Sequence, residues 1–190
     1  MSRHWEDGWW RRAARLSSPN CGPRPEGSDI SLVVIHSISL PPGEYGGDAI
    51  ERLFTNRLDW DAHPYFAAIR GLEVSAHFLI RRDGQTLQFV SCDWRAWHAG
   101  VSSWRGRKSC NDFSIGIELE GLEGGPFEAA QYTALTRLLR ALFNRYPLGA
   151  VAGHEHVASG RKQDPGAGFE WPRLARSLRW PRRLFAPLAT

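Results

Sequence analysis

The pattern of hydrophobic and polar positions predicts a sheet built from a few well-marked strands. Ser31–His36, with the sequence SLVVIH, is a continuous apolar run rich in β-branched residues, which is typical of a strand buried on both faces. Ser114–Glu120, SIGIELE, alternates instead, so that its apolar residues face one way and its glycine and two glutamates the other. Two acids beside a glycine on one face indicate the wall of a cleft. A third, short strand is predicted at Ala150–His154.

Helical periodicity is strongest over Phe127–Tyr146, where apolar residues recur every three or four positions until a proline follows. A shorter helical pattern covers Ala49–Leu58, and Pro64–Gly71 is predicted as either a short helix or a loop. Val74–Ile80 and Thr86–Ser91 flank the sequence RRDGQ, which predicts a hairpin with Asp-Gly at its turn.

The two ends of the chain lack sustained periodicity. Residues 1–30 are rich in Arg, Trp, Pro and Gly, and we expect an irregular N-terminal arm packed on the domain. Residues 169–190 place arginines among apolar residues, which indicates a short amphipathic helix and then a proline-broken tail. We therefore expect one domain over residues 31–175 and a basic C-terminal tail over residues 176–190, because a chain of 190 residues suits a single core.

The charge balance is mildly basic, with a net charge of +4 at pH 7 and a pI near 9.3. This suits a small anionic ligand, whereas nucleic acid usually requires a concentrated basic face, so no nucleic-acid partner is expected. The first residues are charged where a signal peptide needs an apolar run, and no later stretch predicts a membrane span. Three cysteines without C-x-x-C spacing fit a reducing compartment, which favours the cytoplasm. No obligate protein partner is expected.

Candidate chemistry concentrates in Gly153–Gly166, GHEHVASGRKQDPG. His36 and His154 each end a predicted strand, so the rigid sheet can bring their rings together, and Asp164 is the natural third ligand because a residue before proline is held extended. Two histidines and an aspartate would hold one zinc ion per chain and leave a position open for water, as in catalytic sites. His156 is an alternative ligand, because positions i and i+2 of a strand share a face. A single histidine such as His36 is more often an ordinary core or surface residue.

The acid–base residues are less determined by spacing. Glu118 or Glu120 could act as general base on the attacking water, and the alternation of the strand does not choose between them. Lys162 would place an ammonium near the metal, where an oxyanion develops. The ordinary alternatives are solvated acids on a strand face and a surface lysine. The Trp94–Trp97 segment could stack on a ring-shaped ligand or pack within the protein.

Five motifs, in order along the chain, resemble those of the AmpD-type amidases: VIHSISLPPGEYGG, VSAHFLIRRDG, WHAGVS, CNDFSIGIELEG and GRKQDPG. These are bacterial cytoplasmic zinc enzymes of the amidase family that also includes the peptidoglycan recognition proteins, and the similarity covers about residues 9–175. The resemblance implies an α/β (α+β-like) domain with a central mixed sheet flanked by helices and a zinc site at the strand ends. It further implies a zinc amidase domain over residues 31–175. This domain would hydrolyse the amide between the lactyl group of (1,6-anhydro-)N-acetylmuramic acid and L-alanine in muropeptides, during peptidoglycan recycling.

Carried over by position, the family's zinc ligands fall on His36, His154 and Asp164. Its catalytic glutamate falls on Glu118 and its catalytic lysine on Lys162, which chooses between the two glutamates. Further residues are expected to contact the muropeptide: Ser37, Trp97, His98, Arg107 and Asn111.

The chain departs from the family pattern at a few positions. Ser37 stands where close relatives have asparagine, and in HEHVAS His156 replaces an acid and Ser159 a proline. These changes concern loop geometry and substrate contacts and leave the ligands intact. Two rival functions are a module that binds peptidoglycan without cutting it, and an exported amidase that acts on intact cell wall. The complete ligand set argues against the first, and the charged N-terminus against the second.

Overall fold

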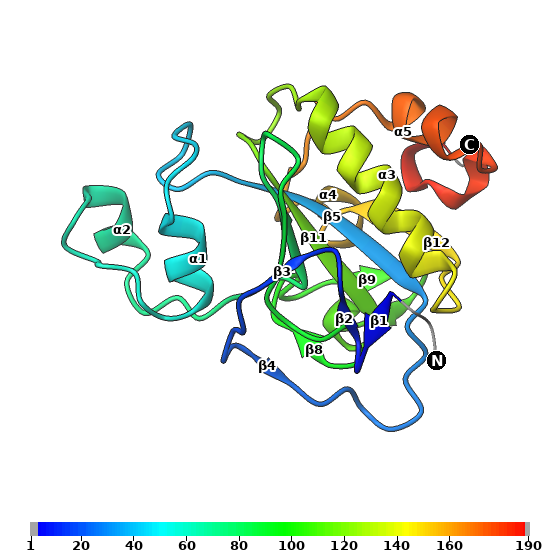
Figure 1. Ribbon diagram of the computed structural model, residues 1–190, viewed down its shortest axis with the longest axis horizontal. Coiled ribbons are helices and arrows are strands. Elements are labelled where there is room, and N and C mark those ends of the chain that lie inside the picture. Colours follow the sequence, from blue (N-terminus) through cyan, green and yellow to red (C-terminus); the bar gives the residue numbers. More distant parts are fainter. Residues whose placement is uncertain (1–3, 189–190) are drawn as a thin grey trace.

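The computed structural model describes residues 4–188, and a six-stranded mixed sheet lies at its centre (Figure 1). The sheet order is β12–β5–β11–β6–β7–β3; the first four strands are parallel, and β7 runs antiparallel to β6. The strands are β3 (Ala14–Arg15), β5 (Leu32–Ile38), β6 (Phe78–Ile80), β7 (Thr86–Gln88), β11 (Ser114–Glu120) and β12 (Ala150–Gly153). The predicted α/β fold with a central mixed sheet flanked by helices is confirmed.

Helices and small two-stranded sheets surround this central sheet. The helices are α1 (Ala49–Phe54), α2 (Pro64–Ala68), α3 (Ala129–Phe143), α4 (His154–Val157) and α5 (Trp171–Leu178), with 3-10 turns η1 (Cys110–Asp112), η2 (Arg182–Leu184) and η3 (Ala186–Leu188). Two-residue strands pair antiparallel as β1 (Trp5–Glu6) with β2 (Trp9–Trp10), β4 (Cys21–Gly22) with β8 (Arg95–Ala96), and β9 (Ser103–Trp104) with β10 (Arg107–Lys108). Within residues 4–188, no helix combines the length and the apolar character that crossing a bilayer requires.

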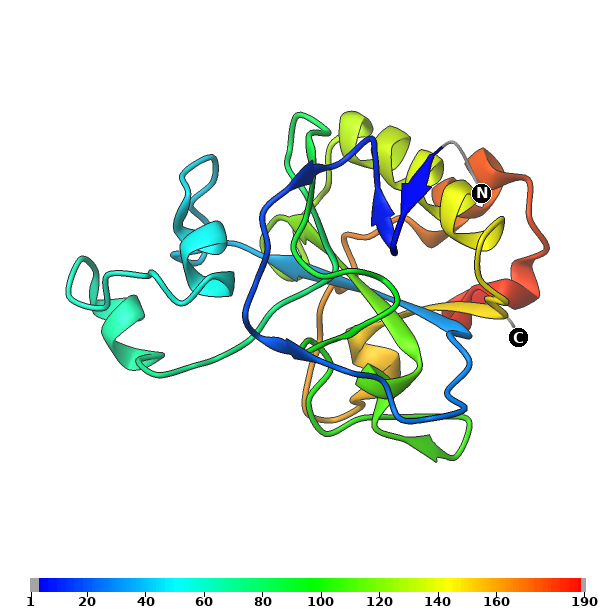
Figure 2. The same cartoon turned by 60° about the horizontal axis from the view of Figure 1, so that its bottom comes forward.

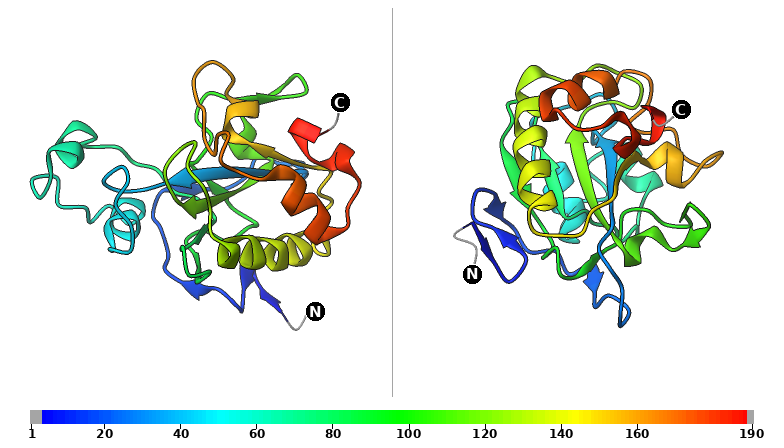
Figure 3. Two further views of the ribbon diagram at one scale, coloured as in Figure 1. Left: turned by 90° about the horizontal axis from the view of Figure 1, so that it is seen from above. Right: turned by 90° about the vertical axis from the view of Figure 1, so that its right-hand side faces the viewer.

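The two faces of the sheet are covered differently (Figure 3). Val33 and Ile35 of β5 share a fully buried core with α3 and α5, whereas Leu32 and Val34 pack on the other face with residues around α4. This alternation follows from the pleat of the strand, in which successive side chains take opposite faces. His36 has the same orientation in the strand as Leu32 and Val34, so its side chain lies on the face of the sheet opposite α3.

Three adjacent parallel strands end side by side near His36. In the register of the sheet, Glu118 of β11 is paired with His36 of β5, and Gly153 of β12 is paired with Ile35. His154 therefore follows directly beside His36. Crevices beyond the carboxyl ends of parallel strands are where α/β proteins generally place their ligands.

The connection from β5 to β6 carries α1 and α2 and extends away from the sheet (Figures 1 and 2). Phe54 of α1 anchors it, packing edge-on against Phe89 with ring centroids 5.1 Å apart. A buried ionic network holds its start: Arg81 donates to Glu120 Oε1 at 2.7 Å and to the carbonyl of Gly47 at 2.6 Å, and pairs with Glu51. This excursion forms one wall of the cavity described below.

The described parts of the two terminal segments are tied into the fold. Residues 1–30, predicted as an irregular arm, contain β1 to β4, and β3 adds a strand to the central sheet. Strands of two residues leave no periodicity in a sequence, so the pattern could not reveal them. The predicted amphipathic helix in residues 169–190 is α5, which crosses the proposed boundary between residues 175 and 176. Beyond it, Phe185 is fully buried and bridges to Val151 of β12.

The internal elements follow the predicted pattern closely. The buried strand, the alternating strand and the long helix appear as β5, β11 and α3. The prediction at Ala150–His154 was wrong at its last residue, because β12 ends at Gly153 and His154 begins α4. His154 and His156 therefore lie on a helical turn, and the argument that they share a strand face does not hold.

Candidate metal and catalytic site

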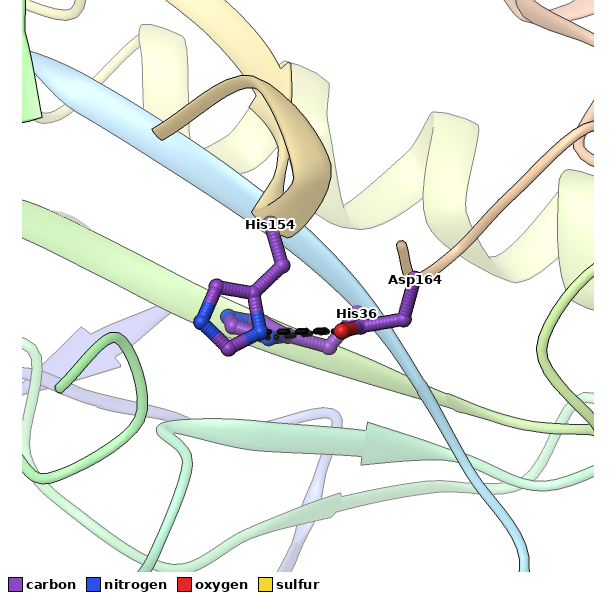
Figure 4. A group of neighbouring side chains, drawn as sticks. All are labelled: His36, His154 and Asp164. Carbon is purple, nitrogen blue, oxygen red and sulfur yellow. Dashed lines mark hydrogen bonds and ion pairs between the residues drawn. The ribbon is translucent and has the colours of Figure 1, made fainter. Parts of the chain in front are cut away.

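His36, His154 and Asp164 converge at the ends of β5 and β12 (Figure 4). His36 Nδ1 lies 3.0 Å from His154 Nδ1 and 3.2 Å from Asp164 Oδ2, and His154 Nδ1 lies 3.0 Å from Asp164 Oδ1. All three side chains are buried. Parallel pairing places the two histidines next to each other, and the loop that follows α4 returns Asp164 to them.

The chemistry of these donors fits a cation. His154 Nε2 lies 3.2 Å from the carbonyl oxygen of Ala99, which can only accept, so the ring proton is on Nε2 and Nδ1 presents a lone pair. Zinc bonds of about 2.0–2.1 Å in a tetrahedral arrangement separate two ligand atoms by about 3.3 Å, close to the separations in this cluster. Burial lowers the pKa of His36 to about 4, so its imidazole is neutral at pH 7, as a metal ligand must be. The three residues could therefore hold a divalent metal ion.

Two glutamates on the same face of β11 have different surroundings. Glu120 is fully engaged: it accepts from Arg81 and from the backbone N–H of Gly46, both at 2.7 Å, and from the N–H of Arg82 at 3.2 Å. Glu118 Oε2 is buried and has no hydrogen-bond partner among residues 4–188. Burial, together with the charge of Asp164, raises the pKa of Glu118 well above its usual value, and the charge of Lys162 opposes this rise. A buried carboxyl with a raised pKa is a candidate for proton transfer, and Glu118 fits this description better than Glu120.

Lys162 is exposed on the loop between α4 and Asp164 and lines the same cavity as Glu118 and the three candidate ligands. The backbone N–H of Lys162 donates to the carbonyl of Ala158 at 3.0 Å, which continues the turn after α4. The structure therefore brings together all five residues predicted as ligands or catalysts.

The cavity has a volume of about 420 Å³, within the range of small-molecule sites. One side is polar and holds the candidate ligands, Glu118 and Lys162. The other side comes largely from the excursion between β5 and β6 and is mainly apolar. Its apolar residues include Leu40, Leu53, Phe54, Tyr65, Ile69, Leu72 and Val74.

The residues predicted to contact substrate divide into two groups. Ser37, Trp97 and His98 line the cavity. Asn111 lies behind it, where its side-chain oxygen accepts from the backbone N–H groups of His98 and Ala99 at 3.2 and 2.8 Å. Arg107 lies on the exposed strand β10, with its guanidinium 4.0 Å from the ring centre of Phe113, and is outside the set of lining residues. Substrate contact remains a prediction for all five.

The side chain of His156 caps the start of helix α4. Its Nδ1 accepts from the N–H of Gly153 at 2.9 Å, and its ring packs edge-on against Trp171. This hydrogen bond ties the third residue of α4 back to the residue before the helix, as a capping box does. His156 takes no part in the cluster of His36, His154 and Asp164.

Sequence reasoning missed most of the apolar wall of the cavity. The available signal was weak: Tyr65 and Leu72 are exposed large apolar residues in a stretch between two well-marked strands. Such residues are common on protein surfaces, and only the folding of the excursion over the strand ends brings them to the site.

The fold and the site together define a class of protein, an α/β domain with a candidate metal centre and a cavity at the carboxyl ends of parallel strands. The sequence profile of the N-acetylmuramoyl-L-alanine amidases matches residues 26–167. The chain belongs to the N-acetylmuramoyl-L-alanine amidase family, as its motifs predicted. A curated relative is the 1,6-anhydro-N-acetylmuramyl-L-alanine amidase AmpD of Citrobacter freundii, 54% identical over 171 residues, which cover 89% of this chain and 91% of the relative.

Solved structures agree with this assignment. A crystal structure of a selenomethionine AmpD derivative superposes with a TM-score of 0.89 at 51% identity, covering 91% of this chain and 98% of the other. The amidase AmiD of E. coli, solved in complex with anhydro-N-acetylmuramic acid-L-Ala-D-γ-Glu-L-Lys, superposes with a TM-score of 0.57 at 30% identity, covering 91% of this chain and 64% of the other.

Proposed function

We propose that the protein hydrolyses the amide between the lactyl group of 1,6-anhydro-N-acetylmuramic acid and L-alanine in muropeptides, in cytoplasmic peptidoglycan recycling. The observation that carries this proposal is the buried Glu118, whose Oε2 has no hydrogen-bond partner in the described part of the chain and which shares one cavity with the three candidate ligands. The named activity of AmpD of Citrobacter freundii, a relative with 54% identity, supports the choice of substrate.

His36, His154 and Asp164 would hold one zinc ion, bound through two imidazole nitrogens and a carboxylate oxygen. Such an ion, when bound, polarises a carbonyl oxygen and lowers the pKa of a water molecule to about 7. Because His36 lies on β5 and His154 directly follows the neighbouring strand β12, little motion is needed to assemble these donors.

Glu118 acts as the proton carrier. Its carboxylate accepts a proton from the water that attacks the amide carbonyl carbon, and later gives that proton to the leaving nitrogen of L-alanine. A carboxyl with an ordinary pKa would hold this proton too weakly near pH 7. The raised pKa of Glu118 brings its proton affinity closer to what both steps need.

Lys162 stabilises the negative charge that develops on the carbonyl oxygen during attack. Its position at the edge of the cavity leaves the ammonium able to approach the reacting carbonyl from solvent. One charged donor aimed at such an oxyanion typically contributes about 10²–10³-fold to kcat.

The shape of the cavity matches an amphipathic ligand. The apolar wall from α1 and α2, together with Trp97, would contact the sugar and the lactyl methyl group, and the polar side would receive the amide. The muropeptide carboxylates suit a chain with a net charge of +4. Ser37, His98, Arg107 and Asn111 remain candidates for direct or supporting contacts.

The test is to incubate the zinc-loaded protein with a defined anhydro-muropeptide and identify the products by mass. We expect free anhydro-N-acetylmuramic acid and an intact peptide that begins with L-alanine. Polymeric cell wall, assayed in parallel, should be turned over far more slowly. Binding of the muropeptide without cleavage would overturn the proposal, and faster cleavage of intact wall would overturn its choice of substrate.

A further inference from the structure

One face of β11 is shaped around the ring of His98. A Cβ atom at Gly116 would lie 2.5 Å from Cγ of His98, so the imidazole rests directly on the backbone of the strand. On the same face, Ser114 lies on one side of Gly116 and Glu118 on the other. The small residue at position 116 thus leaves room for a ring between the strand and the metal cluster.

Both nitrogens of His98 have partners. His98 Nδ1 lies 2.9 Å from His36 Nε2, the nitrogen of that candidate ligand that faces away from the cluster. His98 Nε2 lies 3.3 Å from Ser114 Oγ, and Ser114 Oγ lies 2.5 Å from the carbonyl oxygen of Cys110. The rings of His98 and His36 meet edge to face, at 86°.

The direction of each hydrogen bond in the series from His36 through His98 and Ser114 to Cys110 follows from the acceptor at its Cys110 end. The carbonyl of Cys110 can only accept, so the hydroxyl of Ser114 donates to it and its oxygen is free to accept. His98 then donates from Nε2 to Ser114 and keeps a lone pair on Nδ1. His36 donates from Nε2 to that lone pair. In consequence His36 presents a lone pair on Nδ1, the atom that faces His154 and Asp164.

We propose that His98 is a positioning residue that sets the ring proton of His36 on Nε2 and so prepares Nδ1 to bind the metal. Ligand histidines are commonly oriented by a hydrogen bond from their other nitrogen, and loss of such a partner typically weakens metal binding about 10–100-fold. In this protein the partner is His98, whose ring is oriented by its hydrogen bond to Ser114 and packs against the backbone of Gly116. His154 needs no such relay, because the carbonyl of Ala99 sets its proton directly.

The loop that carries His98 is held in a way that suits this role. The backbone N–H groups of His98 and Ala99 both donate to the side chain of Asn111. Two hydrogen bonds of 3.1 Å join Trp97 to Ser75. The backbone N–H of Trp97 donates to the hydroxyl of Ser75, and the backbone N–H of Ser75 donates to the carbonyl of Trp97. A fixed loop allows the ring of His98 to hold the ring of His36 in one orientation.

The proposal deepens the proposed function, since it concerns one of its ligands, and its first readout needs neither metal nor substrate. In metal-free protein, ¹⁵N NMR of the imidazoles should show His36 protonated at Nε2. In His98→Phe, which keeps a ring but loses the acceptor, we expect a mixture of tautomers. The dissociation constant for zinc, measured by competition with a chelator, should rise about 10–100-fold. His98→Gln restores an acceptor and should recover part of that loss.

Matched variants separate positioning from a general loss of structure. Ser114→Ala and Gly116→Ala leave His98 in the chain but remove its orienting partner or its seat, and both should weaken zinc binding. His63→Asn is the control, because His63 caps α2 outside the cavity and Asn preserves the cap.

If His98→Phe folds and retains the wild-type tautomer and zinc affinity, the proposal is wrong. If His98→Phe does not fold, wild-type zinc affinity in both Ser114→Ala and Gly116→Ala would overturn it. A protein with the expected tautomer and zinc affinity that fails to cleave muropeptide would instead overturn the proposed function alone.

Discussion

Replacing Glu118 by glutamine should have opposite effects on activity and on stability. The change keeps the shape of the side chain and removes its charge and its ability to carry a proton. Because general acid–base residues typically contribute about 10²–10⁴-fold, kcat should fall by about that factor while bound zinc stays unchanged. Stability should rise, because the buried carboxylate of Glu118 has an oxygen with no hydrogen-bond partner among residues 4–188.

The size of the stability effect follows from the raised pKa of Glu118, which burial and the charge of Asp164 cause. When the folded pKa exceeds the unfolded value of about 4.3, the folded state binds more protons between the two values, so the free energy of unfolding decreases as pH rises through that window. Each unit of elevation corresponds to about 1.4 kcal/mol at a pH above the folded pKa. For a chain of this size, that is about 3–6 °C in Tm per unit.

The assay is thermal unfolding of metal-free wild-type and Glu118→Gln protein at several pH values, with kcat measured on the zinc-loaded forms. The two Tm curves should meet near pH 4 and separate as pH rises, with the variant higher. Glu120→Gln is the matched control on the same strand face. It removes one of the two carboxylates that pair with the buried Arg81, the other being Glu51, and should lower the free energy of unfolding by about 1.5–3 kcal/mol at pH 7. A Glu118→Gln protein that is less stable than wild type at pH 7 would refute the charge argument. Full activity with zinc bound would refute the catalytic role.

Three further outcomes are expected. Asp164→Asn should raise the dissociation constant for zinc more than the roughly 10–100-fold typical of a positioning residue, and wild-type affinity in a chelator competition would contradict its role as a ligand. Lys162→Met should lower kcat about 10²–10³-fold with zinc content unchanged, and an equal loss in zinc content would show that it acts on the metal site instead. Gly168→Ala should destabilise by about 1–3 kcal/mol in urea unfolding, because its Cβ would lie 2.0 Å from the carbonyl oxygen of Gly125. Gly47→Ala, whose Cβ would have nothing within 4 Å, is its control and should be close to neutral.

The central elements were predictable because their signals are local. The β-branched run before His36 and the alternation of Ser114–Glu120 each record burial on the faces of a strand, and Phe127–Tyr146 carries the period of a helix. Strand ends also predicted the meeting of His36 and His154, since adjacent parallel strands place their carboxyl ends together. The motifs of the family then chose Glu118, which spacing alone could not do.

Other features depend on contacts between distant parts of the chain. Glu118 and Glu120 are equivalent in the alternation, and they differ because Arg81, which directly follows β6, donates a hydrogen bond to Glu120, whereas Oε2 of Glu118 has no partner among residues 4–188. The start of α4 at His154 is another case, because a helix of four residues is too short to show a period. Because α4 begins at His154, the side chain of His156 lies apart from the cluster and accepts a hydrogen bond from the backbone N–H of Gly153.

The sequence by itself determined the type of fold, the three candidate ligands and, through the resemblance, the family and its chemistry. Each of these predictions rests on short stretches of sequence. The combination of residue types in these stretches is consistent with few other structures or functions. Only the tertiary structure decided that Oε2 of Glu118 is left without a partner in the described residues, and which apolar residues wall the cavity. It also decided that His98 lies between His36 and Ser114, residues 62 positions before and 16 positions after it in the chain. The physical reason is that hydrogen-bond direction and burial are properties of groups in contact, and those contacts form only when the loops close over the ends of the strands.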